Sequence, residues 1–455
     1  MWISLKQSSI WKFYSKIGED MDNIAIESKD YYMRAKMLFQ VRKYKEAEKY
    51  FNKSIEVDSM NIDAYIDLAC MYIEMKQFIK AKEILKKVLV INNKNGEIYF
   101  HLGNIAYINK DIVSARDNYS KAISFGYENP IALYNMAMLN LSSKDIVNAK
   151  LYLNQILEKN PSHIKARLKL IEIANSDLKY EEVLAQSDEL ILQRPDAIEG
   201  YHHKFMALLN LNRDEDALRV ISYALKLYPE DKSFAYDRVL LFIKQGLYQD
   251  ALKYIDENFN FKDEASNVII PQKAKILFMM NMFEEAKDLF EKVDENLFDE
   301  ETRYILMLIY ISKNEFIKAL KICEKIIYTK KMSSPNFYYA ALFFKGLCLK
   351  QLGRDENAKN AFYVANQKIK TQSVNEPENI SLYMYRILCE TFLENYNTAI
   401  ELSNYAISLS EDDDLYIVRG IVYKMMKEEE KSKVDFDKAE QSESQLANIL
   451  KKVVG

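Results

Sequence analysis

The sequence predicts an all-α chain of stacked helical hairpins, and three features of its composition and spacing indicate this fold. Only 10 of the 455 residues are glycine and 7 are proline, far fewer than β-sandwiches, Rossmann folds or disordered chains use at turns and linkers. Three of the prolines, Pro161, Pro195 and Pro229, follow one another at steps of 34 residues. The same step recurs in a column of alanines: Ala47, Ala81, Ala115, Ala149, Ala217 and Ala251.

Seven units of this length fit one frame without a gap, starting near residues 28, 62, 96, 130, 164, 198 and 232. In the second unit Tyr65, Leu68, Ala69 and Tyr72 recur at i, i+3, i+4 and i+7, which is one face of a helix. A second apolar stripe begins at Ala81, so each unit is expected to contain two helices. Small alanines suit a close crossing of these helices, and a proline ends the second one. Neither helix buries its stripe alone, so neighbouring units must stack.

These columns resemble the tetratricopeptide repeat (TPR) family. The second unit matches the family pattern at Tyr65, Leu68, Ala69, Tyr72, Phe78, Ala81, Leu85 and Val88. Beyond residue 265 the spacing is irregular, and five more units are marked by Ala286, Ala319, Gly346, Ala399 and Gly420. The resemblance implies a right-handed superhelical solenoid of about twelve helix hairpins.

The chain is expected to divide into four parts. Residues 1–27 form an N-terminal helical extension or cap, 28–265 a regular array of seven repeats, 266–440 an irregular array of about five, and 441–455 a C-terminal capping helix. Inserted residues at 258–266, 331–337 and 371–379 are expected to be longer turns, and the first is alternatively a hinge. Trp2 and Trp11, interleaved with lysines, either cap the first repeat or dock on an anionic membrane or a partner.

Charge and motifs exclude several classes of function. The 63 basic and 67 acidic residues nearly cancel, so the sequence offers no general positive field for nucleic acid. The four cysteines lack a C-x-x-C spacing, which favours a reducing compartment and a cytoplasmic location. There is no H-E-x-x-H, glycine-rich phosphate loop or G-x-S-x-G motif. We therefore expect no catalytic residue, no metal site, no cofactor and no enzymatic activity.

The resemblance places a binding groove on the first helices of the hairpins, at the residue after each aromatic column position. The candidate groove residues are Tyr32, Ile66, Phe100, Tyr134, Leu168, Tyr236, Tyr304 and Phe343, with His202, Pro271, Met384 and Ile417 in the same column. A stripe this apolar indicates a bound helix or extended peptide. The alternative is burial against the next superhelical turn or in a homo-oligomer.

One subfamily of TPR proteins holds a chain-terminal carboxylate with lysine, asparagine and arginine side chains from successive repeats. Asn104, Asn135, Lys165 and Lys169 stand at matching places here, although Phe100 replaces the first lysine. Ammonium and amide donors that converge hold a carboxylate by charge-assisted hydrogen bonds. This resemblance implies a ligand with an acidic C-terminus, and the alternative is a solvated polar patch.

The sequence therefore predicts a non-catalytic cytoplasmic scaffold or adaptor that holds a protein or peptide segment in its concave groove. Two alternatives stay open at this point. One is a peptide-responsive regulator that acts through a partner. The other is a membrane-associated assembly factor that docks through its N-terminal segment.

Overall fold

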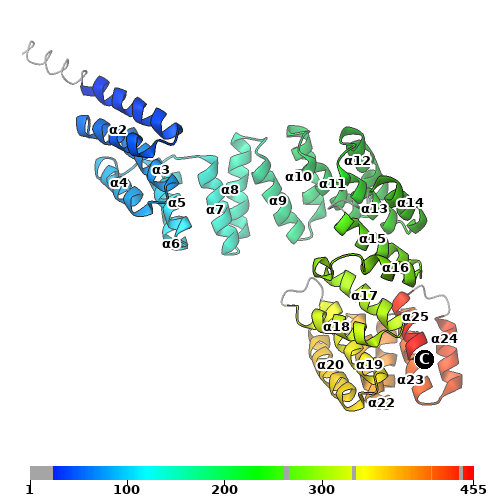
Figure 1. Cartoon of the computed structure of the whole chain (residues 1–455). Coiled ribbons are helices and arrows are strands. Elements are labelled where there is room, and N and C mark those ends of the chain that lie inside the picture. The colour runs from blue at the N-terminus through cyan, green and yellow to red at the C-terminus, as the bar shows by residue number, and fades with distance from the viewer. Residues whose placement is uncertain (1–23, 260–265, 330–334, 411, 440–443, 455) are drawn as a thin grey trace, which may run out of the picture. The chain divides into compact units, whose positions relative to one another are not determined.

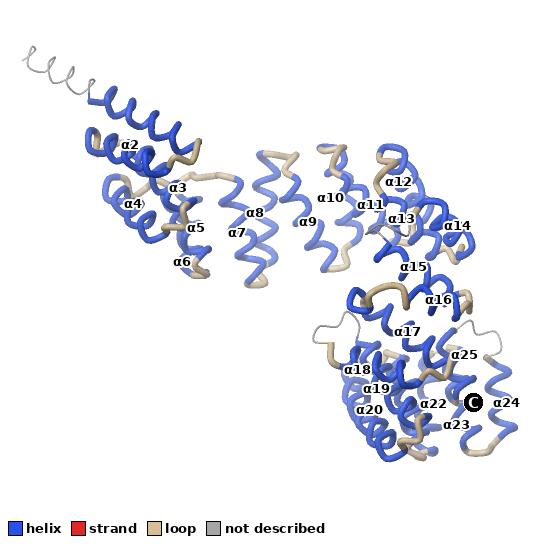
Figure 2. Tube along the Cα trace, in the orientation of Figure 1, coloured by secondary structure: helices blue, strands red, loops and turns tan. Residues whose placement is uncertain are grey.

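The computed structural model describes residues 24–259, 266–329, 335–410, 412–439 and 444–454. Every regular element in these residues is a helix, which confirms the all-α prediction (Figures 1 and 2). The predictions for the N-terminal segment up to residue 23, and for the inserted residues 260–265 and 331–334, lie outside the described residues. The chain divides into two compact units, Met1–Ala217 and Leu218–Gly455. This division falls earlier in the chain than residue 265, where the regular array is predicted to give way to the irregular one.

The first unit consists of helical hairpins, in which each first helix packs on the second helix that follows it. Its helices are a segment over residues 24–40, α2 (Tyr44–Val57), α3 (Ile62–Glu74), α4 (Phe78–Ile91), α5 (Gly96–Ile108), α6 (Ile112–Ser124), α7 (Pro130–Ser142), α8 (Ile146–Lys159), α9 (Ile164–Ser176), α10 (Tyr180–Gln193) and α11 (Ile198–Asn210). The division between the units lies inside α12 (Asp214–Leu227).

The second unit continues the hairpins with less regular lengths. Its helices are α13 (Lys232–Lys244), α14 (Tyr248–Asn258), α15 (Ser266–Met279), α16 (Phe283–Phe290), the 3₁₀ turn η1 (Glu295–Leu297), α17 (Glu300–Ser312), α18 (Phe316–Ile327), α19 (Pro335–Gln351), α20 (Asp355–Asn375), α21 (Ile380–Phe392), α22 (Tyr396–Leu409), α23 (Asp413–Met425), α24 (Glu429–Lys438) and α25 (Gln445–Val453). The described helices before α25 pair into twelve hairpins, as the sequence predicts.

One predicted turn is shorter than expected. Residues 371–375 belong to α20, which runs for 21 residues up to Asn375, and the turn is confined to residues 376–379. Its extra turns stay in contact with the core, since Ile369 is 0% and Ser373 is 6% exposed. Apolar contact therefore extends the helix where inserted polar residues predicted a loop.

The hairpin turns contain a repeat column that the sequence did not reveal. In the first unit the second residue after the first helix of each hairpin has a positive φ of 55–61°, at Arg42, Lys76, Lys110, Lys144, Leu178 and Asn212. Each lies 34 residues after the previous one, and Gly246 takes the next place. The Gln77 N–H donates to the Tyr72 carbonyl at 2.8 Å, which is the bonding of a Schellman turn. Lysine and asparagine thus occupy positions where glycine is usual, which helps to explain the low glycine count.

The repeat columns form the core, as predicted. All six alanines of the 34-residue column are 0% exposed, and Val183, which interrupts the column, is also 0% exposed. Pro161 and Pro195 lie just beyond the ends of α8 and α10, where they prevent the helix from continuing. In the first unit the buried residues form several separate clusters along the array. In the second unit one large apolar cluster extends from Ala274 to Leu450, and a smaller one lies between Ala235 and Ile276.

Candidate functional site

The first helices of the hairpins form an inner face, which is clearest in the second unit. There α15, α17, α19, α21 and α23 pack one against the next. The Tyr304 hydroxyl on α17 lies 3.3 Å from the Tyr385 hydroxyl on α21, two hairpins further along. Helices two hairpins apart approach each other only on the concave side of a curved array. This face is the one where the sequence placed the groove residues.

The predicted groove residues are not equally accessible. Tyr32, Tyr134 and Leu168 in the first unit, and Tyr236 and Tyr304 in the second, are half-buried. Ile66, Phe100 and Phe343 are only 4%, 6% and 0% exposed. These three side chains therefore do not line an open groove, which corrects the expectation of one continuous apolar stripe. The reason is local packing, since the Phe100 ring lies 5.1 Å from the ring of Tyr127, centroid to centroid.

Aromatic packing fills much of the inner face of the second unit. The Phe343 ring centroid lies 5.8 Å from that of Phe362 and 6.0 Å from that of Tyr385. Phe362 stacks on Phe392 at 4.7 Å with an interplanar angle of 10°. Burial raises the pKa of Tyr304 to about 12. In this unit the structure thus supports self-burial, the second of the two alternatives that the sequence left open.

A cluster of polar side chains lies on the first three inner helices. The Tyr32 hydroxyl donates to Asp67 Oδ2 at 2.8 Å, and Lys36 Nζ lies 3.6 Å from the same oxygen. Cys70 Sγ lies 3.4 Å from His101 Nε2. Burial raises the pKa of the Cys70 thiol to about 12 and lowers the pKa of His101 to about 4. Both groups are therefore neutral at pH 7, unlike the thiolate and imidazolium of an activated nucleophile.

The sequence contained a signal for this pair that periodicity alone did not show. Cys70 and His101 are 31 residues apart, and so are Asn104 and Asn135, whose side chains also meet. A spacing of 31 residues is one 34-residue repeat minus three residues. The second residue of each pair therefore lies on the next inner helix, about one helical turn before the position equivalent to the first. Polar residues at this spacing are therefore candidates for contact across adjacent hairpins.

His101 predicts a pH dependence for the first unit. Its pKa of about 4 lies below the ordinary 6.5, so the unfolded chain binds a proton that the folded chain does not. Protonation of His101 therefore leaves the free energy of unfolding unchanged above pH 6.5. Between pH 6.5 and pH 4 it lowers that free energy by up to about 1.4 kcal/mol per pH unit. We expect His101→Asn to lose less stability over this window, as measured by thermal unfolding. Parallel curves for the two chains would contradict the prediction.

The predicted carboxylate clamp is only partly brought together. The Tyr119 hydroxyl donates to Asn104 Oδ1 at 2.7 Å, and Asn135 Nδ2 donates to the Tyr119 hydroxyl at 3.1 Å. Lys169 pairs with Glu172 on its own helix, and Lys165 is exposed. The clamp stays a prediction, and three of its four side chains already have partners within the chain.

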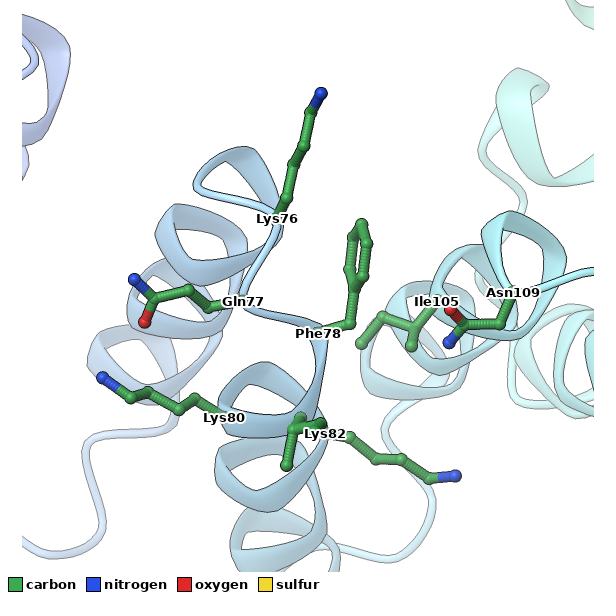
Figure 3. A pocket seen from close by; sticks show the side chains of 8 residues that line it. Lys76, Gln77, Phe78, Lys80, Lys82, Ile105 and Asn109 are labelled. Atoms are coloured by element: carbon green, nitrogen blue, oxygen red, sulfur yellow. The ribbon is translucent and has the colours of Figure 1, made fainter.

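A cavity of about 840 Å³ lies away from the predicted groove, beside a hairpin turn (Figure 3). In Figure 3, Phe78 stands between the turn and the neighbouring helix that carries Ile105 and Asn109. Lys76, Lys80 and Lys82 are at the edge of the cavity. This open surface combines lysine stems with an aromatic ring and offers no acid, base or nucleophile pair.

The described residues contain no group of three or more histidine, cysteine, aspartate and glutamate side chains that could hold a metal ion. Within the same residues, none of the helices combines the length and the apolar character needed to span a bilayer.

Comparison with known proteins supports the family that the repeat columns indicate. Models of the tetratricopeptide repeat match residues 31–59, 62–95, 131–163 and 204–257. The matched segments coincide with hairpins of the structure. These segments of the chain are therefore tetratricopeptide repeats. No curated protein sequence matches it.

Solved structures of the same kind resemble the chain only distantly. The Cut9–Hcn1 structure of the APC/C is 14% identical, with 96% of this chain and 98% of that chain covered and a TM-score of 0.44. YrrB, described as a TPR protein with an unusual peptide-binding site, is 20% identical over 41% of this chain and 97% of its own, with a TM-score of 0.35. A Parabacteroides merdae repeat protein is 16% identical over 51% and 92%, with a TM-score of 0.35.

Proposed function

We propose that this chain is a non-catalytic scaffold that holds a protein or peptide segment on the inner face of its first unit. The array of tetratricopeptide repeats supports the general role in protein interaction. The particular surface is supported by one observation: Tyr32, Tyr134 and Leu168 stay half-buried on that face, whereas Phe343, Met384 and Ile417 in the same column of the second unit are at most 5% exposed. A partner that covers these half-exposed side chains removes their remaining apolar surface from water, which favours binding.

The partner that fits this face is a segment with apolar side chains and polar groups in alternation. The half-exposed apolar residues lie near polar groups such as Asp67, Lys36 and Asn135, which offer hydrogen bonds and charges to an extended or helical segment. We also propose a cytoplasmic location, supported by four free cysteines, three of which are fully buried as thiols.

Site-specific crosslinking in the native lysate tests the proposed surface. Benzoylphenylalanine replaces either Tyr134 on the inner face or Val90 on α4, which is 89% exposed. The expected result is a partner adduct from position 134 that is absent from position 90. The same partner should be lost from the Tyr134→Ser chain and kept by the matched Val90→Ser chain. Equal adducts from both positions, or equal retention by both variants, would show that the inner face is not the binding surface.

A further inference from the structure

The C-terminal helix α25 lies on the inner face of the second unit, where the sequence predicted only an end cap. It contacts α23 and also α17, whose hairpin comes three hairpins earlier (Figure 1). Ala447, Ile449 and Leu450 are at most 2% exposed, whereas Asn448 and Lys451 face solvent. Beneath it, the eight consecutive residues 305–312 of α17 are all buried. A helix with one open face cannot bury such a run, so α25 covers the inner side of α17.

The ends of α25 make hydrogen bonds with the ends of three successive inner helices. Gln445 Nε2 donates to the carbonyl of Met279, the last residue of α15, at 3.1 Å. Lys452 Nζ donates to the carbonyl of Ser312, the last residue of α17, at 3.1 Å. Gln351, the last residue of α19, donates to the Val453 carbonyl at 3.5 Å. Helix C-termini leave carbonyls unpaired and carry partial negative charge, so an amide and an ammonium are suitable partners.

Among the described helices of the second unit, α25 differs from the others because it has no hairpin partner. Its three polar contacts reach residues 102, 140 and 166 positions away in the chain. With nine residues, α25 is shorter than an isolated helix needs to be stable in water, so its helical form depends on the surface beneath it. Its departure leaves each hairpin's own helix pair in place. These are the properties of a peptide that folds on binding.

We propose that the inner face of the second unit is a groove for a short amphipathic helix, and that α25 occupies it as an intramolecular ligand. The ligand pattern is a buried Ala-x-Ile-Leu face, with an amide at the N-terminal end and a lysine at the C-terminal end. A helix of this pattern supplied in trans competes with α25 for the groove. This surface belongs to a different unit from the one proposed above, so the two proposals stand or fall separately.

The test uses the full chain with one charge placed on either face of α25. Leu450→Asp puts a carboxylate into the groove and releases the helix, whereas Asn448→Asp adds the same charge on the solvent side. The probe is a fluorescent peptide of residues 444–454, acetylated and amidated. We expect the peptide to bind the Leu450→Asp chain at least about tenfold more tightly than the wild-type and Asn448→Asp chains, because α25 no longer competes. A peptide that itself carries Leu450→Asp should not bind.

A folded Leu450→Asp chain that binds the peptide no better than the wild-type chain would overturn the proposal. A second measurement needs no variant: hydrogen exchange of the wild-type chain. If α25 opens by itself, its amides exchange at least about tenfold faster than those of α17. Equal protection of the two helices would show that α25 opens only when the unit unfolds, and the groove would then be part of the core instead of a binding site.

Discussion

Replacing Arg419 by leucine is expected to lower the free energy of unfolding of the second unit by about 3–5 kcal/mol. Arg419 on α23 donates through Nε and Nη2 to the two carboxylate oxygens of Asp435 on α24, each at 2.7 Å. A third bond joins Nη1 to Asn404 Oδ1 at 2.7 Å. Asp435 is 2% exposed, so the variant leaves a buried carboxylate without its cation. Urea unfolding followed by circular dichroism measures the loss.

The size of this effect depends on the burial of the Asp435 carboxylate. Two control variants distinguish the cost of a buried, unpaired charge from the loss of an ion pair. Lys350 pairs with Asp355 at 2.6 Å, but their side chains are 52% and 67% exposed. Lys350→Leu is therefore expected to cost less than about 1 kcal/mol. Adding Asp435→Asn to Arg419→Leu should recover much of the loss, because the uncompensated charge is gone. If the second substitution recovers nothing, the buried carboxylate is not the cause.

The second large effect is expected at Gly346, where valine should destabilise the unit by about 3 kcal/mol through overpacking. A Cβ at this position on α19 would lie 2.6 Å from two ring carbons of Phe362 on α20. The ring cannot yield easily, because it is 1% exposed and stacked on Phe392. Thermal and urea unfolding of the full chain measure the change.

A smaller side chain opposite Gly346 should relieve the strain. In a chain with Phe362→Leu, the Gly346→Val substitution is expected to cost at least about 1 kcal/mol less than in the wild-type chain. Gly103 faces Tyr119 and Gly420 faces Phe436 with the same close approach, at 2.7 and 2.8 Å. Additive losses at Gly346 and Phe362 would mean that the ring does not set the cost.

The structure suggests that the two units use the same inner face differently. In the first unit the face stays partly open and carries polar side chains such as Asp67 and Asn135. In the second it is closed by aromatic packing and by α25. In such a scaffold the inner face of the first unit is accessible to a partner, whereas the inner face of the second unit is covered.

Much of the fold was predictable because a solenoid repeats a local pattern. The 34-residue step of alanines and prolines gave the hairpins, their crossing points and the ends of second helices such as α8 and α10. The close approach at Gly346 recurs at Gly103 and Gly420, each of which faces an aromatic ring of its own hairpin. These features depend on contacts within one hairpin or with its neighbour, so a repeated sequence pattern encodes them directly.

The candidate site was less predictable, because it depends on how successive hairpins are rotated relative to one another. Phe100 and Tyr134 occupy the same column, yet Phe100 is buried and Tyr134 is half-exposed. The Tyr304 and Tyr385 hydroxyls meet across 81 residues, and Lys452 reaches Ser312 across 140. By itself the sequence determined the helices, their pairing and the type of repeat. Only the tertiary structure decided which inner surfaces are open, because small rotations between hairpins accumulate into a curvature that no single repeat specifies.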